Sequence, residues 1–179
     1  MMNSETTGLI MLDRDGTLIK HVPYLNQIEQ VVFMDGVFEA LKVLNQKNYK
    51  LAIVTNQSAI GRGLATLEQV NKVNKFILEE FLARDIPIGS IKMCPHTPEE
   101  NCQCRKPKPH LGKLLINELK PDLNKTFMVG DKLVDIEFAV NLGIKPINIS
   151  SRVTSNVSSV EFARDWRDFQ MNIIGKLIS

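Results

Sequence analysis

Short apolar runs that predict buried strands alternate with amphipathic stretches that predict helices along most of this chain. The apolar runs lie at residues 9–12, 50–55, 88–93, 126–129 and 144–149. Apolar residues at helical spacing predict helices that begin after Gly36 and that cover residues 66–84, 110–119 and 134–142. Strands and helices that alternate in this way form a parallel sheet with helices on both faces. We therefore predict an α/β fold with a central parallel sheet.

The length and composition fit one globular domain spanning residues 1–179, with 44% hydrophobic and 23% charged residues. The net charge is only +2 and the basic residues are scattered, which argues against nucleic-acid or membrane partners. No apolar run approaches the roughly 20 residues of a membrane span, and residues 1–7 lack the layout of a signal peptide. We expect a cytoplasmic monomer in which a serine-rich loop at 150–159 precedes a helical tail at about 160–178.

Polar residues that could take part in catalysis or bind a metal follow three of the predicted strands. Asp13 and Asp15 follow the first strand, Thr55 ends the second, and Asp131 follows the fourth. Ligands of parallel sheets bind beyond the carboxyl ends of the strands, so these side chains should converge on one site. Carboxylates so close together repel each other unless a cation holds them, which favours a hard divalent ion such as Mg²⁺.

Such a site suits phosphoryl transfer. With Mg²⁺ held by Asp13, Asp15 (through its backbone carbonyl as one option) and Asp131, a dianionic phosphate could enter. Asp13 could attack phosphorus, and Asp15 could protonate the departing alkoxide and later accept a proton from water. Thr55 and Lys106 could stabilise the charge that spreads over the phosphoryl oxygens.

A second cluster of metal-binding residue types lies within a short, polar and proline-rich stretch. Three cysteines and one histidine fall at about 94–104, as Cys94, His96, Cys102 and Cys104. Four such ligands with no open position describe a closed tetrahedral Zn²⁺ site that is structural. Because Arg105 and Lys106 come next in the chain, we hypothesise that the zinc loop positions these cations rather than takes part in chemistry.

The chain resembles the haloacid dehalogenase (HAD) phosphatases over about residues 9–149. Four motifs occur in the order of that superfamily: Asp13-x-Asp15-Gly16-Thr17, Thr55-Asn56, Lys106, and Gly130-Asp131-Lys132-x-x-Asp135. The resemblance implies a Rossmann-like HAD fold. Residues 55–63, 94–96 and 102–107 also resemble one branch of the superfamily, which contains heptose 1,7-bisphosphate 7-phosphatases and histidinol-phosphate phosphatases.

The resemblance implies a role for each residue of these motifs. Asp13 would be the nucleophile, Asp15 the acid and base, and Asp131 a ligand of the Mg²⁺ ion. Thr55 and Lys106 would stabilise the transition state. The remaining implied residues are Asp135 as a partner behind the metal ligands, and His21, Tyr24, Asn56, Gln57, Ser58, Arg105 and Lys132 as substrate contacts.

Spacing also bears on access to the site. Between Asp15 and Thr55 the chain has room for one flap and one helix but not for a separate cap domain, so we expect a capless and open site. Arg62 and Arg105 could form a second subsite for an anion, which would suit a bisphosphate. The basic loop around Arg62 would then help to set specificity.

Several functions remain in view. The segment 57–63 and the Tyr24 loop look closer to the heptose bisphosphate members of the branch, which implies a Mg²⁺-dependent phosphatase of a phosphorylated sugar. The short zinc loop is also compatible with histidinol phosphate, a phosphorylated amino alcohol. A nucleic-acid end phosphatase would need a basic groove or aromatic platform that the sequence lacks. A non-catalytic module that binds phosphorylated ligands would not need the full set of catalytic residues.

Overall fold

The computed structural model describes residues 7–150 and 159–178. Most of the predicted serine-rich loop, residues 151–158, lies outside the described residues. The strands are β1 (Leu9–Leu12), β2 (Lys50–Asn56), β3 (Ile88–Cys94), β4 (Thr126–Gly130), β5 (Lys145–Ile149) and β6 (Glu161–Ala163). The α-helices are α1 (Val37–Gln46), α2 (Ser58–Gly61), α3 (Leu67–Leu82), α4 (His110–Leu119), α5 (Leu133–Leu142), α6 (Trp166–Asn172) and α7 (Ile174–Leu177). Short 3-10 turns lie at η1 (Ile28–Gln30), η2 (Pro98–Glu100) and η3 (Leu123–Lys125).

The six strands form one sheet in the order β3-β2-β1-β4-β5-β6, and every neighbouring pair is parallel. The chain runs outward from β1 to β3, then crosses to β4 on the other side of β1. The strand order therefore reverses between β1 and β4, which is where open α/β sheets bind ligands. Leu12 lies opposite Ile53 and Val129, so β1, β2 and β4 end at the same edge of the sheet.

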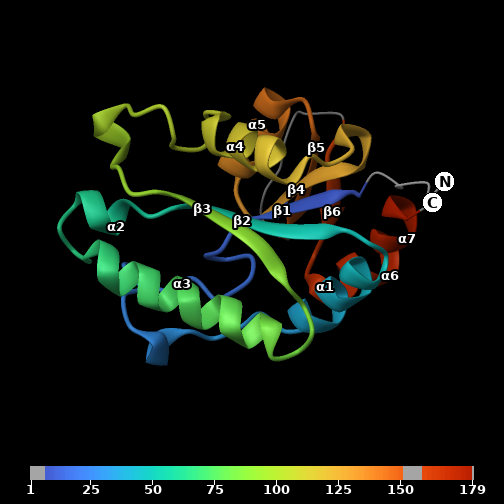
Figure 1. Cartoon of the computed structure of the whole chain (residues 1–179), viewed down its shortest axis with the longest axis horizontal. Helices are drawn as coiled ribbons and strands as arrows, with labels where there is room; N and C mark the ends of the chain where they lie inside the picture. Colours follow the sequence, from blue (N-terminus) through green and yellow to red (C-terminus); the bar gives the residue numbers. More distant parts are fainter. Residues whose placement is uncertain (1–6, 151–158, 179) are drawn as a thin grey trace.

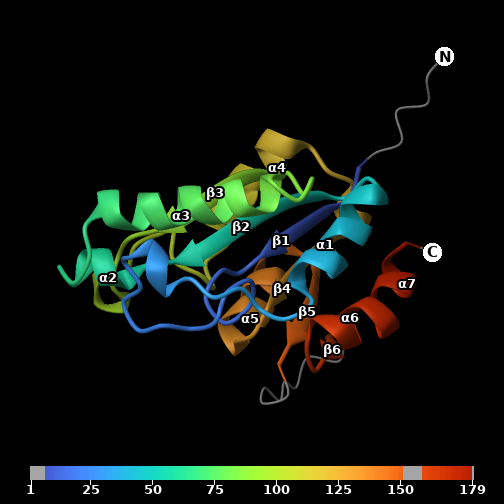
Figure 2. The same cartoon turned by 90° about the horizontal axis from the view of Figure 1, so that it is seen from below.

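Helices cover both faces of the sheet (Figures 1 and 2). In Figure 1, α4 and α5 lie above the sheet, and α1, α3 and α6 lie below it. Along each strand, alternate residues serve the two layers: Ile10 and Leu12 pack with α1, α3 and α6, whereas Leu9 and Met11 pack with α4 and α5. Because both faces are buried, β1 is apolar throughout.

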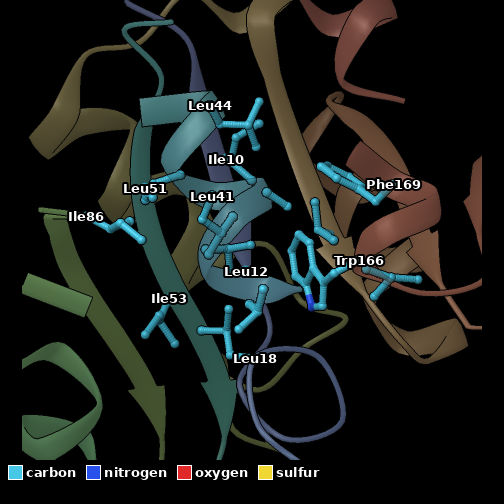
Figure 3. Packing of buried hydrophobic residues seen from close by; sticks show 14 of the residues in the cluster. Ile10, Leu12, Leu18, Leu41, Leu44, Leu51, Ile53, Ile86, Trp166 and Phe169 are labelled. Atoms are coloured by element: carbon cyan, nitrogen blue, oxygen red, sulfur yellow. The ribbon is translucent and has the colours of Figure 1, made fainter. Parts of the chain in front are cut away.

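The C-terminal segment completes the larger core layer. Trp166 and Phe169 of α6 are buried against strand residues, and Figure 3 shows the Trp166 ring lying beside Leu12 and Leu18. The indole Nε1 of Trp166 donates a hydrogen bond of 2.7 Å to the backbone carbonyl of Thr17. The tail therefore packs against the loop that follows β1.

The α/β fold class is confirmed, as is the absence of a cap domain between residues 13 and 126, all of which are described. The prediction for the tail at 160–178 is only partly right. It begins with the short strand β6, which pairs with β5 at the sheet edge, and continues as two short helices instead of one. Three residues are too few for an alternating pattern to be recognised in the sequence. The sequence pattern also does not predict the short helix α2.

Among the described residues, no helix is long and apolar enough to cross a membrane.

Candidate active site

The loops after β1 and β4 meet at the point where the strand order reverses. The backbone N–H of Asp13 donates to the carbonyl of Val129 at 2.9 Å, which links the start of the loop after β1 to the end of β4. The hydroxyl of Thr17 donates to Oδ1 of Asp131 at 3.3 Å. The structure therefore brings Asp13 and Asp131 together, as the sequence predicts.

Gly16 makes this approach possible. Its φ of +95° lies in the left-handed region, which residues with a Cβ atom rarely adopt. A Cβ atom added at this position would collide with the carboxylate of Asp131. The glycine of the first motif is thus needed both for the turn and for the close contact between the two loops.

Lys106 lies at the centre of the site and is almost completely buried. Its Nζ donates to Oδ1 of Asp13 at 2.7 Å, to Oδ1 of Asp135 at 2.6 Å and to the carbonyl of Val54 at 2.8 Å. Burial opposes the charged form, but the two carboxylates outweigh it and raise the pKa of Lys106 above its ordinary value. Lys106 is therefore a fixed cation beside the predicted nucleophile.

Asp13, Asp131 and Asp135 can each offer an oxygen to a single ion, since these atoms lie within 4.8 Å of one another. Burial raises the pKa of Asp135 to about 6, with Lys106 opposing the rise and Asp13 adding to it. Burial also raises the pKa of Asp131, although Lys132 opposes the rise. Crowded carboxylates with raised pKa values are the arrangement that a divalent cation relieves.

The carboxylate of Asp15 is not part of this cluster. Its Oδ2 accepts 2.9 Å and 2.7 Å hydrogen bonds from Nε of Arg14 and Nε2 of Gln57, and its Oδ1 accepts one of 3.1 Å from Nη2 of Arg14. The amide of Gln57 also donates to the hydroxyl of Thr55 at 2.8 Å. The backbone carbonyl of Asp15 accepts a bond from Lys132 at 3.2 Å. The Asp15 carboxylate is thus held by Arg14 and Gln57 and is not among the carboxylates gathered for an ion, so its expected contact with Mg²⁺ through the backbone carbonyl stays a prediction.

Two adjoining cavities open beside these residues. The smaller, of about 150 Å³, is lined by Asp13, Asp15, Thr55, Asn56, Arg105, Lys106, Lys132, Val134 and Asp135. The larger, of about 280 Å³, is lined by Arg14, Asp15, His21, Val22, Pro23, Tyr24, Leu25, Asn56, Gln57, Ser58, Ala59 and Lys132. All the expected substrate contacts except Arg62 line one or both cavities. Asp15 lies on the wall shared by both.

Arg62 lies elsewhere. Its guanidinium is 3.5 Å from the carboxylate of Glu99 and lines neither cavity, so the structure does not place it among the residues around Asp13 and Asp15. The reason is local packing: the N–H of Gly61 donates to the carbonyl of Pro95 at 2.9 Å, which draws the end of α2 onto the 95–100 segment. Of the two arginines of the expected anion subsite, Arg105 lines the smaller cavity and Arg62 does not, so a joint subsite stays a prediction.

The four residues of the second cluster come together as the sequence predicts. Sγ of Cys104 is 3.2 Å from both Sγ of Cys94 and Nδ1 of His96. Sγ of Cys102 is 3.5 Å from each of the other two sulfurs. Zn–S bonds of about 2.3 Å would place tetrahedral ligands about 3.8 Å apart, so the cluster needs to open only slightly around such an ion. Burial raises the pKa of Cys94 to about 12; despite burial, hydrogen bonds with Cys94 and Cys104 lower that of Cys102 to about 7.

This cluster is linked by hydrogen bonds to both cavities. Arg105 donates to the carbonyl of His96 at 3.1 Å, and the N–H of Gln57 donates to the carbonyl of Cys94 at 2.7 Å. Asn56 and Lys106 bond to each other twice, at 3.0 Å and 3.1 Å, through the Asn56 amide and the Lys106 backbone. The cluster therefore lies behind the segments that carry the cations and the predicted substrate contacts.

Comparison with known proteins agrees with this geometry. Residues 24–143 match the family of haloacid dehalogenase-like hydrolases. This chain belongs to that family. The first motif, at residues 13–17, precedes the matched stretch, but the curated relatives extend the likeness over more of the chain. The resemblance to the HAD superfamily is confirmed.

Two curated relatives illustrate the range of sequence identity and coverage. The D-glycero-beta-D-manno-heptose-1,7-bisphosphate 7-phosphatase of Yersinia pestis is 34% identical over 172 residues, 91% of this chain and 90% of the relative. The protein of the same name from Pasteurella multocida is 41% identical over 133 residues, 71% of this chain and 72% of the relative. The crystal structure of D,D-heptose 1,7-bisphosphate phosphatase from B. bronchiseptica, complexed with magnesium and phosphate, has a TM-score of 0.84 at 23% identity, covering 95% of this chain and 99% of that one. At that identity, the structural likeness supports the fold alone.

Proposed function

We propose that this HAD hydrolase is a Mg²⁺-dependent phosphatase that removes the 7-phosphate of D-glycero-D-manno-heptose 1,7-bisphosphate. The observation that carries the proposal is the buried contact of Lys106 with Asp13 and Asp135, beside Asp131, at the edge of one small cavity. Relatives of that activity by name, at 34% and 41% identity, support the choice of substrate over histidinol phosphate.

Asp13 is the proposed nucleophile. Its carboxylate oxygen forms a bond to phosphorus as the ester P–O bond breaks, which leaves an acyl phosphate on Asp13. Lys106, at 2.7 Å from Asp13, holds this carboxylate in place and offsets the negative charge of the incoming phosphate. Thr55 is buried at the edge of the same cavity, where its hydroxyl can bond a phosphoryl oxygen.

Asp15 is the proposed acid and base. Its carboxyl proton passes to the oxygen of the leaving alkoxide, and the carboxylate that results later accepts a proton from the attacking water. That water bonds to phosphorus, inorganic phosphate leaves, and the Asp13 carboxylate is regenerated. The place of Asp15 on the wall between the two cavities suits a group that serves both the phosphate and the leaving group.

The carboxylate cluster fits Mg²⁺, which prefers oxygen ligands. Asp13, Asp131 and the backbone carbonyl of Asp15 would hold the ion, while Asp135 orients Lys106 and accepts from the backbone N–H of Lys132 at 3.2 Å. When bound, Mg²⁺ would neutralise the carboxylates and polarise the phosphoryl oxygens.

The Cys/His cluster fits a structural Zn²⁺ ion, because three sulfurs and one imidazole close the tetrahedron and leave no position for substrate. Its proposed role is to position Arg105, Lys106 and the start of α2. The sugar would occupy the larger cavity, against His21, Tyr24 and Asn56–Ser58.

A substrate panel tests the proposal. Purified protein with Mg²⁺ is given heptose 1,7-bisphosphate, histidinol phosphate and a 5′-phosphorylated oligonucleotide, and phosphate release is measured. We expect kcat/KM for the heptose to exceed that for the others by at least about 100-fold, and Asp13→Asn to abolish release of phosphate. Preference for histidinol phosphate would overturn the substrate, and undiminished turnover by Asp13→Asn would overturn the chemistry.

A further inference from the structure

Arg14 stands between the two catalytic aspartates in sequence, yet its side chain is only 1% exposed and points into the protein. A buried guanidinium loses its hydration, so its retention requires partners that compensate for the loss. Within the part of the chain that the structure describes, its one ion-pair partner is Asp15. The guanidinium donates hydrogen bonds to Asp15 and to Asn74.

The contact with Asp15 fixes the direction of its carboxylate. Nε and Nη2 of Arg14 bond to the two different oxygens of Asp15, at 2.9 Å and 3.1 Å. A two-point contact between a planar guanidinium and a planar carboxylate sets the orientation of both groups, which a single contact cannot do. Gln57 donates a third bond, of 2.7 Å, to Oδ2.

The other end of the fork is anchored on α3. Nη1 of Arg14 donates to Oδ1 of Asn74 at 2.7 Å, and Nδ2 of Asn74 lies 3.8 Å from Sδ of Met93. Asn74 is a polar residue on the buried, otherwise apolar face of the helix, between Val73 and Ile77. A buried amide at such a position needs a hydrogen-bonding partner, and Arg14 provides it. The orientation of Arg14 is therefore set by a helix packed against the sheet.

We infer that Arg14, anchored by Asn74, is a positioning residue that holds Asp15 in the orientation needed for proton transfer to the leaving group. The inference rests on the proposed function and extends it to Arg14, whose residue type the first motif leaves open, and to Asn74, which lies outside the four motifs. Arg14 borders the larger cavity, but its guanidinium is only 1% exposed and is bonded to Asp15 and Asn74, so its proposed action on the reaction is through Asp15.

The test compares two leaving groups. Alkoxide from an alkyl phosphate needs a proton as it departs, whereas 4-nitrophenolate does not. With enzyme in excess, release of alcohol from the heptose bisphosphate and of nitrophenolate from 4-nitrophenyl phosphate is followed over one turnover. For Arg14→Met we expect alkyl release to slow by about 100-fold and aryl release by less than about fivefold, the range that loss of general acid catalysis allows. KM and the Mg²⁺ dependence should remain near those of the wild type.

Three further variants sharpen the result. Arg14→Lys keeps the charge but not the fork, so it should show a smaller loss of the same selective kind; Asn74→Ala should do likewise. Arg84→Met serves as the control for loss of an arginine near α3. Arg84 follows the C-terminal end of this helix, where its guanidinium packs on the Phe38 ring and donates to the carbonyl of Glu80. In an Asp15→Asn background, Arg14→Met should add less than about threefold to the slowing of alkyl release.

The outcomes separate the two ideas. Equal slowing of both leaving groups, a change in KM alone, or full additivity with Asp15→Asn would overturn the role of Arg14 and leave the proposed function standing. Wild-type protein that releases neither leaving group would overturn the proposed function and this inference with it. If Arg14→Met fails to fold, Arg14→Lys and Asn74→Ala carry the same comparison.

Discussion

Lys106 forms ion pairs with two carboxylates, Asp13 and Asp135, and all three side chains are buried. Removing one member of a buried charge cluster is costly, because the charges that remain have neither partner nor solvent. The contact of Lys106 with Asp13 should therefore stabilise the fold as well as hold the nucleophile in place. Measurements with and without Mg²⁺ can separate these two effects.

We expect Lys106→Met to lower the free energy of unfolding of the metal-free protein by about 3 kcal/mol, since it leaves two buried carboxylates uncompensated. Saturating Mg²⁺ should restore part of the loss, because the ion supplies positive charge at the same place. Denaturant unfolding with and without Mg²⁺ measures both. Lys72→Met, at an exposed position on α3, serves as the control and should change little. A loss of stability confined to the control would contradict this role of Lys106.

Mg²⁺ binding should depend on pH in the weakly acidic range. Burial raises the pKa of Asp135 to about 6 and also raises that of Asp131. A proton on Asp131 competes directly with the ion, and a proton on Asp135 removes negative charge beside it, so Mg²⁺ binding should weaken as the pH falls through about 6 and level off above about pH 7. Titration calorimetry should give a Kd for Mg²⁺ that rises at least about tenfold between pH 7 and pH 5. A Kd that is constant over this range would contradict the burial of the cluster.

Most residues of the site could be predicted because their types are restricted by the chemistry. Asp13, Asp131 and Lys106 each follow a strand or metal loop in a recognisable motif. The partnership of Arg14 and Asn74 could not be predicted, since 60 residues separate them and a polar residue on a helix normally indicates an exposed face. Arg62 shows the reverse: its position in a glycine loop suggested a subsite, but Glu99 pairs with it.

At the scale of elements, the segment 95–109 has little apolar surface of its own to bury. It is yellow-green in Figure 1 and lies at the same end of the molecule as α2. The N–H of Gly61 donates to the carbonyl of Pro95, and Arg105, within the segment, donates to that of His96. The N–H of Gln57 donates to the carbonyl of Cys94, the residue just before the segment, so these bonds link it to both sides of the site. Its conformation should depend on the metal that its thiolates bind.

Removal of that metal should therefore reduce catalysis without unfolding the sheet. We expect chelation, or Cys104→Ser, to lower kcat/KM by at least about tenfold, because Arg105 and Lys106 lose their fixed positions. Metal content, turnover and far-UV circular dichroism are measured on the same samples, and readdition of Zn²⁺ to chelated wild-type protein should restore activity. Loss of zinc with unchanged turnover would refute the positioning role.

Helix α6 supports the opposite side of the site through Trp166. We expect Trp166→Phe, which removes the bond from Nε1 to the Thr17 carbonyl but retains most of the apolar contact, to cost about 1 kcal/mol. Trp166→Ala should cost about 3 to 5 kcal/mol, because it also leaves a cavity in the core. Thermal and denaturant unfolding measure both values. Equal losses in the two variants would show that the hydrogen bond, and not the ring, accounts for the stabilisation.

The long elements could be predicted from periodicity, and the short ones could not. Strands β1 to β5 and helices α1 and α3 to α5 lie close to their expected positions, because each contains enough residues to show a repeating pattern. The three residues of β6 and the four of α2 show no such pattern. Their formation depends on neighbours, β5 for β6 and the 95–100 segment for the end of α2.

At the scale of the whole molecule, the strand order decides the chemistry. Because β4 lies beside β1, the loops that carry Asp13 and Asp131 meet, and because β2 lies on the other side, Thr55 reaches the same edge. No separate domain is inserted between these strands, so the cavities remain open to a small phosphorylated sugar. The proposed function depends on Asp13 becoming phosphorylated at this place.

Trapping of the acyl phosphate is the most direct measurement. Protein turning over heptose 1,7-bisphosphate with Mg²⁺ is quenched in acid, treated with borohydride and digested, and the peptides are analysed by mass spectrometry. Borohydride reduces an aspartyl phosphate to homoserine, so we expect homoserine at position 13 in the wild type and none in Asp13→Asn. Homoserine at another aspartate, or steady turnover with no modified peptide, would contradict a nucleophilic role for Asp13.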